Sequence, residues 1–370
     1  MKLCIIYNYA QHYRTNIFTL MDKTFDCDWY FGDSMGDVKK MDYSLLRGRV
    51  TEVSKVHLFG SWYYQKGVPS LITKNYDVYL ILSDTRALSG WLFSLMAKLY
   101  PKKKVYYWSH GWYGKESGIE RFIKKILYRL PNGGTFLYGN YARELMVKEG
   151  FNPNKLFTIH NSLAYDQQFE IRKQLSVKPI YSEHFANTNP NLMFVGRLTP
   201  VKKLDQILQA MTICRESGKK YNLTLIGGGE KTDELKALAE ELGLEKNVWF
   251  YGPCYDEVLL SNLIYNADLC VSPGNVGLTA IHAMVFGCPV LTHDNFPWQM
   301  PEFEAIHDGV TGAFFKYNSV ESLSEAINKW FQQKADNRDL VRKDCMAEID
   351  TSWNPYFQID VLKKQLLKDE

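Results

Sequence analysis

The chain has 370 residues, of which 46% are hydrophobic and 14% aromatic, and its formal net charge is +3. This length exceeds one ordinary domain and the apolar content is ample for packed cores, so two globular domains are expected. The small net charge argues against a nucleic-acid partner. The seven cysteines lie mostly inside apolar runs without metal-type spacing, which is typical of reduced core residues in a cytoplasmic protein.

The N-terminal half alternates short apolar runs with polar or amphipathic stretches, as expected for an α/β domain. The runs predicted as strands are residues 2–7, 28–31, 53–58, 78–82, 104–108, 135–138 and 155–159. Helices are predicted from residue 15 and over residues 88–99 and 140–149. No apolar run reaches the length of a membrane span, and the first one is too short for a signal peptide.

Polar side chains follow several of these strands, at the sheet edge where open α/β domains bind ligands. His12 and Arg14 lie after the first strand, and His110 lies after the strand 104–108. A surface loop explains His12 equally well, and a strand-end cap is the alternative for His110. Asp84 and Arg86 follow the strand 78–82, and for them a surface role is preferred.

Residues 113–129 mix lysines and arginines with aromatic and aliphatic side chains, which predicts an amphipathic basic helix. Such a helix could rest on an anionic membrane surface. The alternative is an apolar stripe that faces the core, with a solvated basic back. Peripheral membrane contact is therefore one of two interpretations.

The second half begins after a polar stretch without periodicity, and we predict an interdomain linker over residues 166–190. Strands are predicted at residues 192–195, 221–226, 248–251, 267–272 and 288–292, with helices between them. The first strand runs into GRLTPVKK, which contains Arg197, Lys202 and Lys203. Cations at a helix start oppose the macrodipole, so a bound anion explains them better than local stability does. A solvated basic face is the alternative.

Residues 266–295 predict a strand, a glycine loop, a helix and a second strand. Gly274 and Gly277 form the loop, and Gly287 closes the helix. The free N–H groups at the start of such a helix suit a phosphate. An ordinary βαβ unit with glycines in its turns is the alternative for this stretch taken alone.

These motifs together resemble the retaining nucleotide-sugar glycosyltransferases of the GT-B fold, the large family numbered four. Four stretches carry the resemblance in order along the C-terminal half, and the N-terminal half resembles the family more weakly. The stretches are GRLTPVKK, LTLIGGGEKTDELKALAEELGLEKNVWFYGP, ADLCVSPGNVGLTAIHAMVFGCPVLTHDN and EAIHDGVTGAFF. The resemblance implies an α/β protein with two Rossmann-like domains facing a central cleft and a C-terminal helix that crosses back to the first domain.

The implied domains are an acceptor-binding domain over residues 1–165, the linker 166–190, a nucleotide-sugar-binding domain over 191–350, and a tail helix over 351–370 that packs on the first domain. Arg197, Lys202 and His110 are the expected catalytic residues, and His12 and Arg14 the expected acceptor contacts. The resemblance further implies donor contacts from Gly196, Gly228, Pro253, Gly274, Asn275, Val276, Gly277, Leu278, Thr279, His282 and Glu304.

The sequence departs from the family at one pair of positions. The family signature usually carries two glutamates, which by implication contact the transferred sugar and the ribose hydroxyls; the matching residues here are Gly274 and His282. Gly274 retains only a backbone N–H for a ligand. His282 can exchange one hydrogen bond with a ribose, or it can be hydrogen-bonded within the protein without a ligand.

The resemblance predicts a retaining glycosyltransferase of the hexosyltransferase type. It would move a sugar from a UDP-, GDP- or other NDP-sugar to a hydroxyl of a glycan or lipid-linked acceptor, in the synthesis of surface polysaccharide or lipopolysaccharide. No metal or other cofactor is expected, because Arg197 and Lys202 can stabilise the leaving diphosphate. The location would be cytoplasmic, at the inner face of the membrane if the basic helix binds lipid. The alternatives are a nucleotide-sugar epimerase and a non-catalytic relative that binds a nucleotide or glycan.

Overall fold

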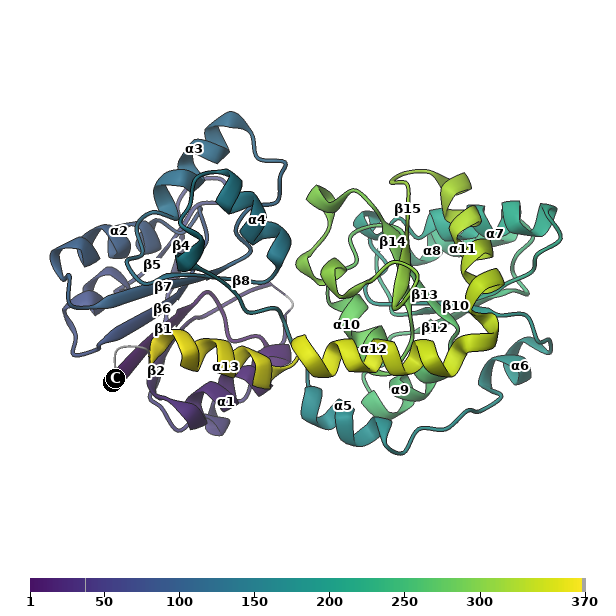
Figure 1. The fold of residues 1–370 in the computed structure, drawn as a ribbon, viewed down its shortest axis with the longest axis horizontal. Helices are drawn as coiled ribbons and strands as arrows, with labels where there is room; N and C mark the ends of the chain where they lie inside the picture. The colour runs from purple at the N-terminus through teal and green to yellow at the C-terminus, as the bar shows by residue number, and fades with distance from the viewer. Residues whose placement is uncertain (37, 368–370) are drawn as a thin grey trace. The chain divides into compact units, whose positions relative to one another are not determined.

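The chain folds into two compact units, each built on a parallel sheet (Figure 1). The structure is a computed structural model that describes residues 1–36 and 38–367. Unit 1 comprises Met1–Ala164 and the residues from Asn354 onward, and unit 2 comprises Tyr165–Trp353. The prediction of two Rossmann-like folds is confirmed by the two sheets.

Unit 1 contains a seven-stranded sheet with the order β3-β2-β1-β6-β7-β8-β9, all parallel. The strands are β1 (Lys2–Tyr7), β2 (Asp26–Gly32), β3 (Val50–Val53), β6 (Val78–Leu82), β7 (Lys104–Ser109), β8 (Gly134–Leu137) and β9 (Leu156–Thr158). The helices are α1 (Thr15–Thr24), α2 (Leu88–Met96), α3 (Gly118–Leu127), α4 (Asn140–Lys148) and α13 (Pro355–Leu366). The strand order reverses between β1 and β6, and ligands bind beside such a reversal at the carboxyl ends of the strands.

Residues 53–58, predicted as one strand, are divided between two elements. Strand β3 ends at Val53, and β4 (Lys55–His57) pairs with β5 (Tyr63–Gln65) in a separate antiparallel hairpin. The apolar run is therefore interrupted at Ser54, because the chain leaves the edge of the large sheet there and turns into the hairpin.

Successive residues of the central strands point to opposite faces of the sheet. Apolar residues at both alternating positions therefore form two separate cores, one on each face. Leu3, Ile5 and Tyr7 of β1 join the core on the side of α1 and α13. Cys4 and Ile6 join the core on the side of α2, α3 and α4. The sheet is thus buried on both faces, which explains why its strands read as continuous apolar runs.

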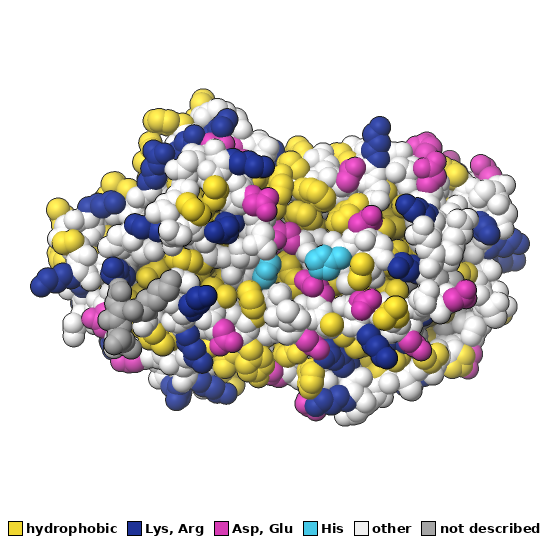
Figure 2. All heavy atoms as spheres, in the orientation of Figure 1, with side chains coloured by type: hydrophobic (Ala, Val, Ile, Leu, Met, Phe, Trp, Pro, Cys, Tyr) yellow, Lys and Arg dark blue, Asp and Glu magenta, His cyan; other side chains and the backbone are white. Residues whose placement is uncertain are grey.

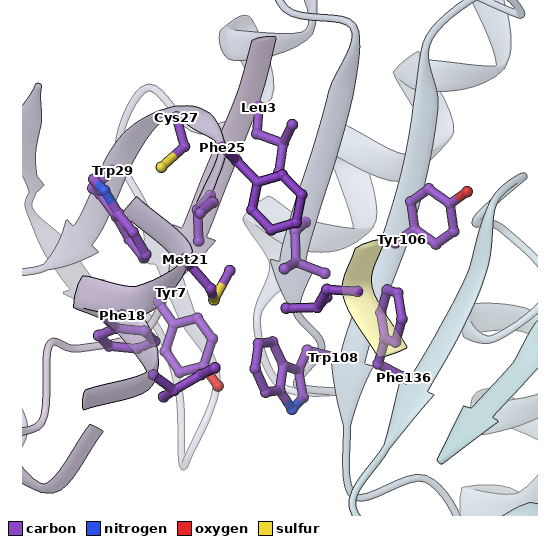
Figure 3. Packing of buried hydrophobic residues seen from close by; sticks show 14 of the residues in the cluster. Leu3, Tyr7, Phe18, Met21, Phe25, Cys27, Trp29, Tyr106, Trp108 and Phe136 are labelled. Atoms are coloured by element: carbon purple, nitrogen blue, oxygen red, sulfur yellow. The ribbon is translucent and has the colours of Figure 1, made fainter. Parts of the chain in front are cut away.

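The core beneath α1 and α13 is rich in large aromatic side chains (Figure 3). The ring centroids of Phe18 and Trp29 lie 5.2 Å apart, and those of Tyr7 and Trp108 lie 6.2 Å apart. All four rings are almost fully buried. These contacts fix α1 on the sheet and thereby position the loop that joins β1 to α1.

Helix α13 completes this core from a distant part of the sequence. Its residues Ile359, Leu362 and Leu366 are buried in the same cluster as α1 and β1. The amide of the buried Gln358 donates to the carbonyl oxygen of His160 at 3.0 Å. Residues 368–370 of the predicted tail lie outside the described residues.

Substitution of a core residue in α13 should destabilise unit 1. Leu362 is 0% exposed, so Leu362→Ala should lower the free energy of unfolding by about 2–5 kcal/mol through lost burial and the cavity left behind. Leu367, 37% exposed, is the matched control, and Leu367→Ala should change it by less than about 0.5 kcal/mol. Urea denaturation measures both, and equal effects would contradict the packing of α13.

Unit 2 contains a six-stranded sheet with the order β12-β11-β10-β13-β14-β15, all parallel. The strands are β10 (Asn191–Val195), β11 (Asn222–Ile226), β12 (Val248–Gly252), β13 (Leu269–Ser272), β14 (Val290–His293) and β15 (Gly312–Phe315). The helices are α5 (Tyr165–Arg172), α6 (Ile180–Phe185), α7 (Asp205–Glu216), α8 (Thr232–Glu241), α9 (Glu257–Asn266), α10 (Leu278–Val285), α11 (Val320–Lys334) and α12 (Arg338–Ser352). This is the Rossmann order, with its reversal between β10 and β13.

Residues 166–190, predicted as a linker, contain α5 and α6 and pack as part of unit 2. Gln168 of α5 donates to Glu257 of α9 at 2.8 Å, and the hydroxyl of Tyr181 of α6 donates to the carbonyl oxygen of Leu263 at 2.6 Å. Both Gln168 and Tyr181 are buried. The low periodicity of this stretch reflects short helices anchored by polar contacts.

Among the described residues, no helix combines the length and the apolar character that crossing a bilayer requires.

Candidate active site

The loop between β13 and α10 ends in backbone N–H groups at a helix start. Gly277 is the N-cap of α10 and has a φ of 53°, a left-handed conformation that favours glycine. In the described part of the chain, the N–H groups of Gly277, Leu278 and Thr279 make no hydrogen bond. They lie at the strand-order reversal, so they form a site suited to a phosphate.

Two earlier N–H groups of the same loop are already used inside the protein. The N–H of Val276 donates to Oε1 of Gln299 at 2.8 Å, and that of Gly274 donates to the carbonyl oxygen of Lys202 at 3.0 Å. The expectation that the backbone N–H of Gly274 is open to a ligand is therefore corrected. The donor groups begin at Gly277.

Lys202 ties the loop after β10 to the loop after β13. It ends the short 3-10 helix η6 (Pro200–Lys202), and its Nζ donates to the carbonyl oxygen of Asn275 at 2.6 Å and to Oδ1 of Asn275 at 2.9 Å. An ammonium group has three N–H donors, so one remains for a ligand. The structure thus brings Lys202 together with the predicted donor loop.

Burial lowers the pKa of Lys202 to about 8; the negative charge of Glu302 opposes this shift and the positive charge of Arg197 adds to it. The side chain of Arg197 is exposed. Because its charge acts on Lys202, the two cations share one region of the surface. An anion bound there would hold Lys202 in its charged form.

Lys203 is held by other partners. Its Nζ donates to the hydroxyl of Tyr317 at 2.8 Å and to Oδ1 of Asn318, and it lies 4.0 Å from the centroid of the Tyr317 ring. Lys203 has a φ of 51°, in the left-handed region. The sequence placed Lys203 with Arg197 and Lys202, but the structure assigns it to this separate contact.

Gly274 is a point of close backbone approach. A Cβ atom there would lie 1.9 Å from the carbonyl oxygen of Val201 and 2.8 Å from Cα of Lys202. The space that the family's glutamate would occupy is therefore filled by the backbone of the neighbouring loop. The absence of a side chain at this position is what allows Lys202 to reach Asn275.

The glycines after β10 and β11 serve a similar purpose. The N–H of Gly196 donates to the carbonyl oxygen of Ile226, and the N–H of Leu198 donates to that of Gly228, each at 3.0 Å. A Cβ atom on Gly227 would lie 1.9 Å from the carbonyl oxygen of Gly196. These loops are joined backbone to backbone, so Gly196 and Gly228 are packing positions as well as predicted donor contacts.

Gln299 and Glu302 are site residues outside the predicted catalytic, donor and acceptor residues. The Nε2 of Gln299 donates to Oγ1 of Thr292 at 2.8 Å and to the carbonyl oxygen of His293 at 3.0 Å, while its Oε1 accepts from Val276. Glu302 is buried on the 3-10 helix η8 (Pro301–Ala305), which also carries the half-buried Glu304. The only signal for them was a polar insertion next to the signature region.

Two further residues predicted as donor contacts, Thr279 and Pro253, each contact a neighbouring segment of unit 2. The hydroxyl of Thr279 donates to the carbonyl oxygen of Val195 at 3.0 Å, which joins α10 to the end of β10. Pro253, predicted at the base-binding loop, is exposed and lies 3.3 Å from a Cβ atom built on Gly228. The loop after β12 is thereby adjacent to the loop after β11.

His282 lies one turn inside α10 and contacts a carboxylate from another helix. Its Nε2 lies 3.0 Å from Oε1 of Glu257, which also accepts from Gln168 at 2.8 Å. Burial acts to raise the pKa of Glu257, but the hydrogen bond and charge of His282 and the bond from Gln168 bring this pKa below its ordinary value. Glu257 is therefore ionised near neutral pH.

Unit 1 has a cavity of about 510 Å³ beside its own strand-order reversal. Arg14 lines it and is buried; its Nη2 donates to the hydroxyl of Tyr138 at 2.6 Å, and its guanidinium lies 5.5 Å from the centroid of the Tyr7 ring. Asp84 and Arg86, for which a surface role was preferred, also line this cavity and pair at 3.1 Å.

His110 lines the same cavity, and its imidazole is neutral near pH 7. Burial lowers its pKa to about 4, and the positive charges of Arg14 and Lys124 add to this shift. The buried Nδ1 has no hydrogen-bond partner among the described residues. His110 can therefore exchange a hydrogen bond with a ligand in the cavity.

His12 does not line the cavity. It is exposed, and its Nδ1 lies 3.2 Å from the carbonyl oxygen of Lys39. The 3-10 helix η1 (His12–Arg14) places Arg14 inward and His12 outward. Of the two predicted acceptor contacts, the structure therefore brings only Arg14 to the cavity.

The described residues contain no group of three or more His, Cys, Asp or Glu side chains placed to hold a metal ion.

The fold is that of the GT-B glycosyltransferases. The lipopolysaccharide outer core galactosyltransferase WaaB is similar over 100% of both chains, with a TM-score of 0.72 and 15% identity. Anabaena Alr3699/HepE, solved in complex with UDP, is similar over 98% of this chain and 99% of that one, with a TM-score of 0.72 and 15% identity.

Residues 180–344 match the family described as glycosyl transferases group 1. Among relatives, an uncharacterized 41.2 kDa protein in the cps region of Klebsiella pneumoniae is 26% identical over 59% of this chain and 58% of its own length. The D-inositol 3-phosphate glycosyltransferase of Nocardia farcinica is 31% identical over 37% of this chain and 32% of its own length. The matches thus span between a third and somewhat more than half of these relatives.

Replacement of Gly274 by alanine should disturb the site from within. The new Cβ would press on Val201, so the loop after β10 must move and Lys202 must loosen from Asn275. We expect a loss of about 1–3 kcal/mol in the free energy of unfolding, as for other overpacked positions. Chemical denaturation measures it.

Gly90 in α2 is the matched control, because the nearest atom to a Cβ there is 3.9 Å away. Gly90→Ala should instead raise the free energy of unfolding by about 0.5–1 kcal/mol. A Gly274→Ala protein as stable as wild type would contradict the close approach of the two loops.

Proposed function

We propose that this protein is a retaining glycosyltransferase of the hexosyltransferase type. It transfers a sugar from a nucleoside diphosphate donor to a hydroxyl of a glycan or lipid-linked acceptor, in the synthesis of surface polysaccharide or lipopolysaccharide. The proposal is supported by the bond from Lys202 to Asn275, two residues before the N-cap of α10, and by the positive charge of Arg197 acting on Lys202. The relatives named for the cps region and for the lipopolysaccharide outer core support this setting.

The chemistry follows from where negative charge grows. When the bond between the sugar C1 and the diphosphate breaks, its electron pair stays on the phosphate oxygen. Lys202, Arg197 and the N–H groups of Gly277, Leu278 and Thr279 would stabilise that oxygen. The acceptor hydroxyl forms the new bond to C1 on the face that the diphosphate leaves, and its proton passes to the departing phosphate oxygen. Fixed donors aimed at developing charge are the largest single source of rate in such sites, which is why we propose turnover without a metal ion.

Unit 1 would supply the acceptor site. Its cavity of about 510 Å³ is lined by Arg14, His110 and the pair of Asp84 and Arg86. Charged and neutral hydrogen-bonding groups side by side suit a polyhydroxylated or phosphorylated acceptor. The neutral His110 would hold one acceptor or sugar hydroxyl.

Removal of either cation should slow transfer far more than it weakens folding. Lys202→Ala and Arg197→Ala should each lower kcat/KM by about 10²–10³-fold, as loss of an oxyanion-stabilising donor does. Lys203→Ala should leave kcat/KM near the wild-type value, because Lys203 bonds Tyr317 and Asn318. Turnover of the UDP- or GDP-sugar that the wild type uses is the measurement.

Wild-type turnover by both alanine variants would overturn the proposed donor chemistry. Binding of a nucleotide sugar by the wild type without transfer or hydrolysis would instead favour a non-catalytic binding protein. Turnover of the sugar without any acceptor would favour an epimerase.

Helix α3 supports contact with an anionic membrane. Ile119, Phe122 and Ile126 are 77%, 66% and 43% exposed along one side of the helix, and Figure 2 shows hydrophobic and basic side chains gathered over α3. Arg121 and Lys125 flank them and both pair with Glu149. An apolar stripe bordered by cations is the pattern of an interfacial helix, and such contact would bring a lipid-linked acceptor within reach.

The double variant Ile119→Ser/Phe122→Ser should bind anionic vesicles about tenfold or more weakly, because two apolar side chains no longer enter the interface. Leu340→Ser is the control, since Leu340 is also exposed but lies on α12 of unit 2. Co-sedimentation with phosphatidylglycerol vesicles measures binding. Equal binding by wild type and both variants would argue against α3 as the membrane contact.

A further inference from the structure

The most informative polar group outside the family motifs is the carboxylate of Glu257. It stands on the first turn of α9, directly after the N-cap Asp256, whose side chain accepts from the N–H groups of Val258 and Leu259. A carboxylate in the first turn of a helix is stabilised by the helix dipole. Glu257 is thus placed to remain ionised while it faces α10.

The side chain of His282 is partly exposed, unlike those of its neighbours in α10. Its neighbours Ile281, Ala283 and Met284 are at most 2% exposed, whereas the side chains of His282 and Glu257 are 19% and 20% exposed. One turn of helix, about 5.4 Å, separates His282 from Leu278, and both lie on the same side of α10. The His282 side therefore continues the surface that begins with the free N–H groups.

Among the described residues, hydrogen bonds reach one oxygen of Glu257, Oε1. Oε1 accepts from Nε2 of His282 at 3.0 Å and from Nε2 of Gln168 at 2.8 Å. No bond to Oε2 is found among the described residues. Because a carboxylate only accepts, Nε2 of His282 carries the proton directed at it, and Glu257 keeps Oε2 as an acceptor for a further donor. Oε2 thus belongs to a carboxylate that partners from two other helices, α5 and α10, hold in place.

We propose that Glu257 binds a hydroxyl of the donor's ribose, with His282 and Gln168 as the residues that position it. This inference rests on the proposed function, since it requires a nucleoside diphosphate on α10. Oε2 of an ionised carboxylate is an acceptor that suits an O–H donor of a ribose. The carboxylate that position 282 lacks is thereby supplied by α9, one helix away.

The test compares ribose with deoxyribose in each protein, so that any change in the folded fraction cancels. Calorimetry gives the Kd of UDP and GDP and of their 2′-deoxy and 3′-deoxy counterparts for the wild type, Glu257→Gln and the control Glu245→Gln, an exposed carboxylate after α8. Wild type and control should prefer the ribonucleotide over at least one deoxy form by about tenfold or more, as for a hydrogen bond to a charged group. Glu257→Gln should lose most of this preference.

The second variant, His282→Ala, should also reduce the preference, because Oε1 then loses its histidine partner and the carboxylate can turn. A preference in Glu257→Gln equal to that of wild type, or wild-type binding that ignores both hydroxyls, would overturn the inference and leave the proposed transferase standing. A wild type that binds neither UDP nor GDP in any form would overturn both.

Discussion

The amine of Lys202 joins two loops that the sequence separates by some seventy residues, and the candidate site depends on that contact. Two conditions make it possible. Parallel strands β10 and β13 are neighbours, so their carboxyl ends emerge side by side. Gly274 has no Cβ, so the backbone of the first loop can lie directly on the second. With Asn275 fixed, Gly277 can turn and present the first N–H groups of α10.

Polar residues outside the sequence motifs hold the site loop in place and act on the charge of Lys202. Gln299 uses all the hydrogen-bonding ends of its amide to hold Val276, Thr292 and His293 in place. The buried Glu302 offsets part of the cost of burying Lys202, whose pKa is still lowered to about 8. Above about pH 8, Lys202 is largely neutral, and an anion that binds beside it favours the protonated form. Anion binding is therefore coupled to proton uptake in that range. The hydrogen bonds of Gln299 thus hold the loop in place before a ligand binds, while the charge of Lys202 changes on binding.

The sequence predicted the sheets well because strands buried on both faces read as uninterrupted apolar runs. Strands β1 and β6 have the bounds expected from composition alone. The glycine loops were also predictable, since a left-handed turn at Gly277 and close contact at Gly274 exclude most other residues. Strands and turns whose conformation depends on a single short segment could therefore be predicted from the residues of that segment.

Side-chain direction and distant partners were not predictable. Lys202 and Lys203 are adjacent residues of the same type, so the sequence does not distinguish them. The left-handed backbone of Lys203 directs its side chain to Tyr317. His12 and Arg14 share one turn, yet they face opposite ways. Glu257 belongs to a helix that no motif covers, so only the packing of α5, α9 and α10 reveals its contact with His282.

Helix α13 has a consequence for the order in which the protein is made. The strands of unit 1 are complete by Thr158, but its aromatic core also needs Ile359, Leu362 and Leu366. A ribosome delivers these residues only after all of unit 2 has emerged. Unit 2 can therefore fold first. Part of the apolar core of unit 1 stays exposed until α13 packs against it.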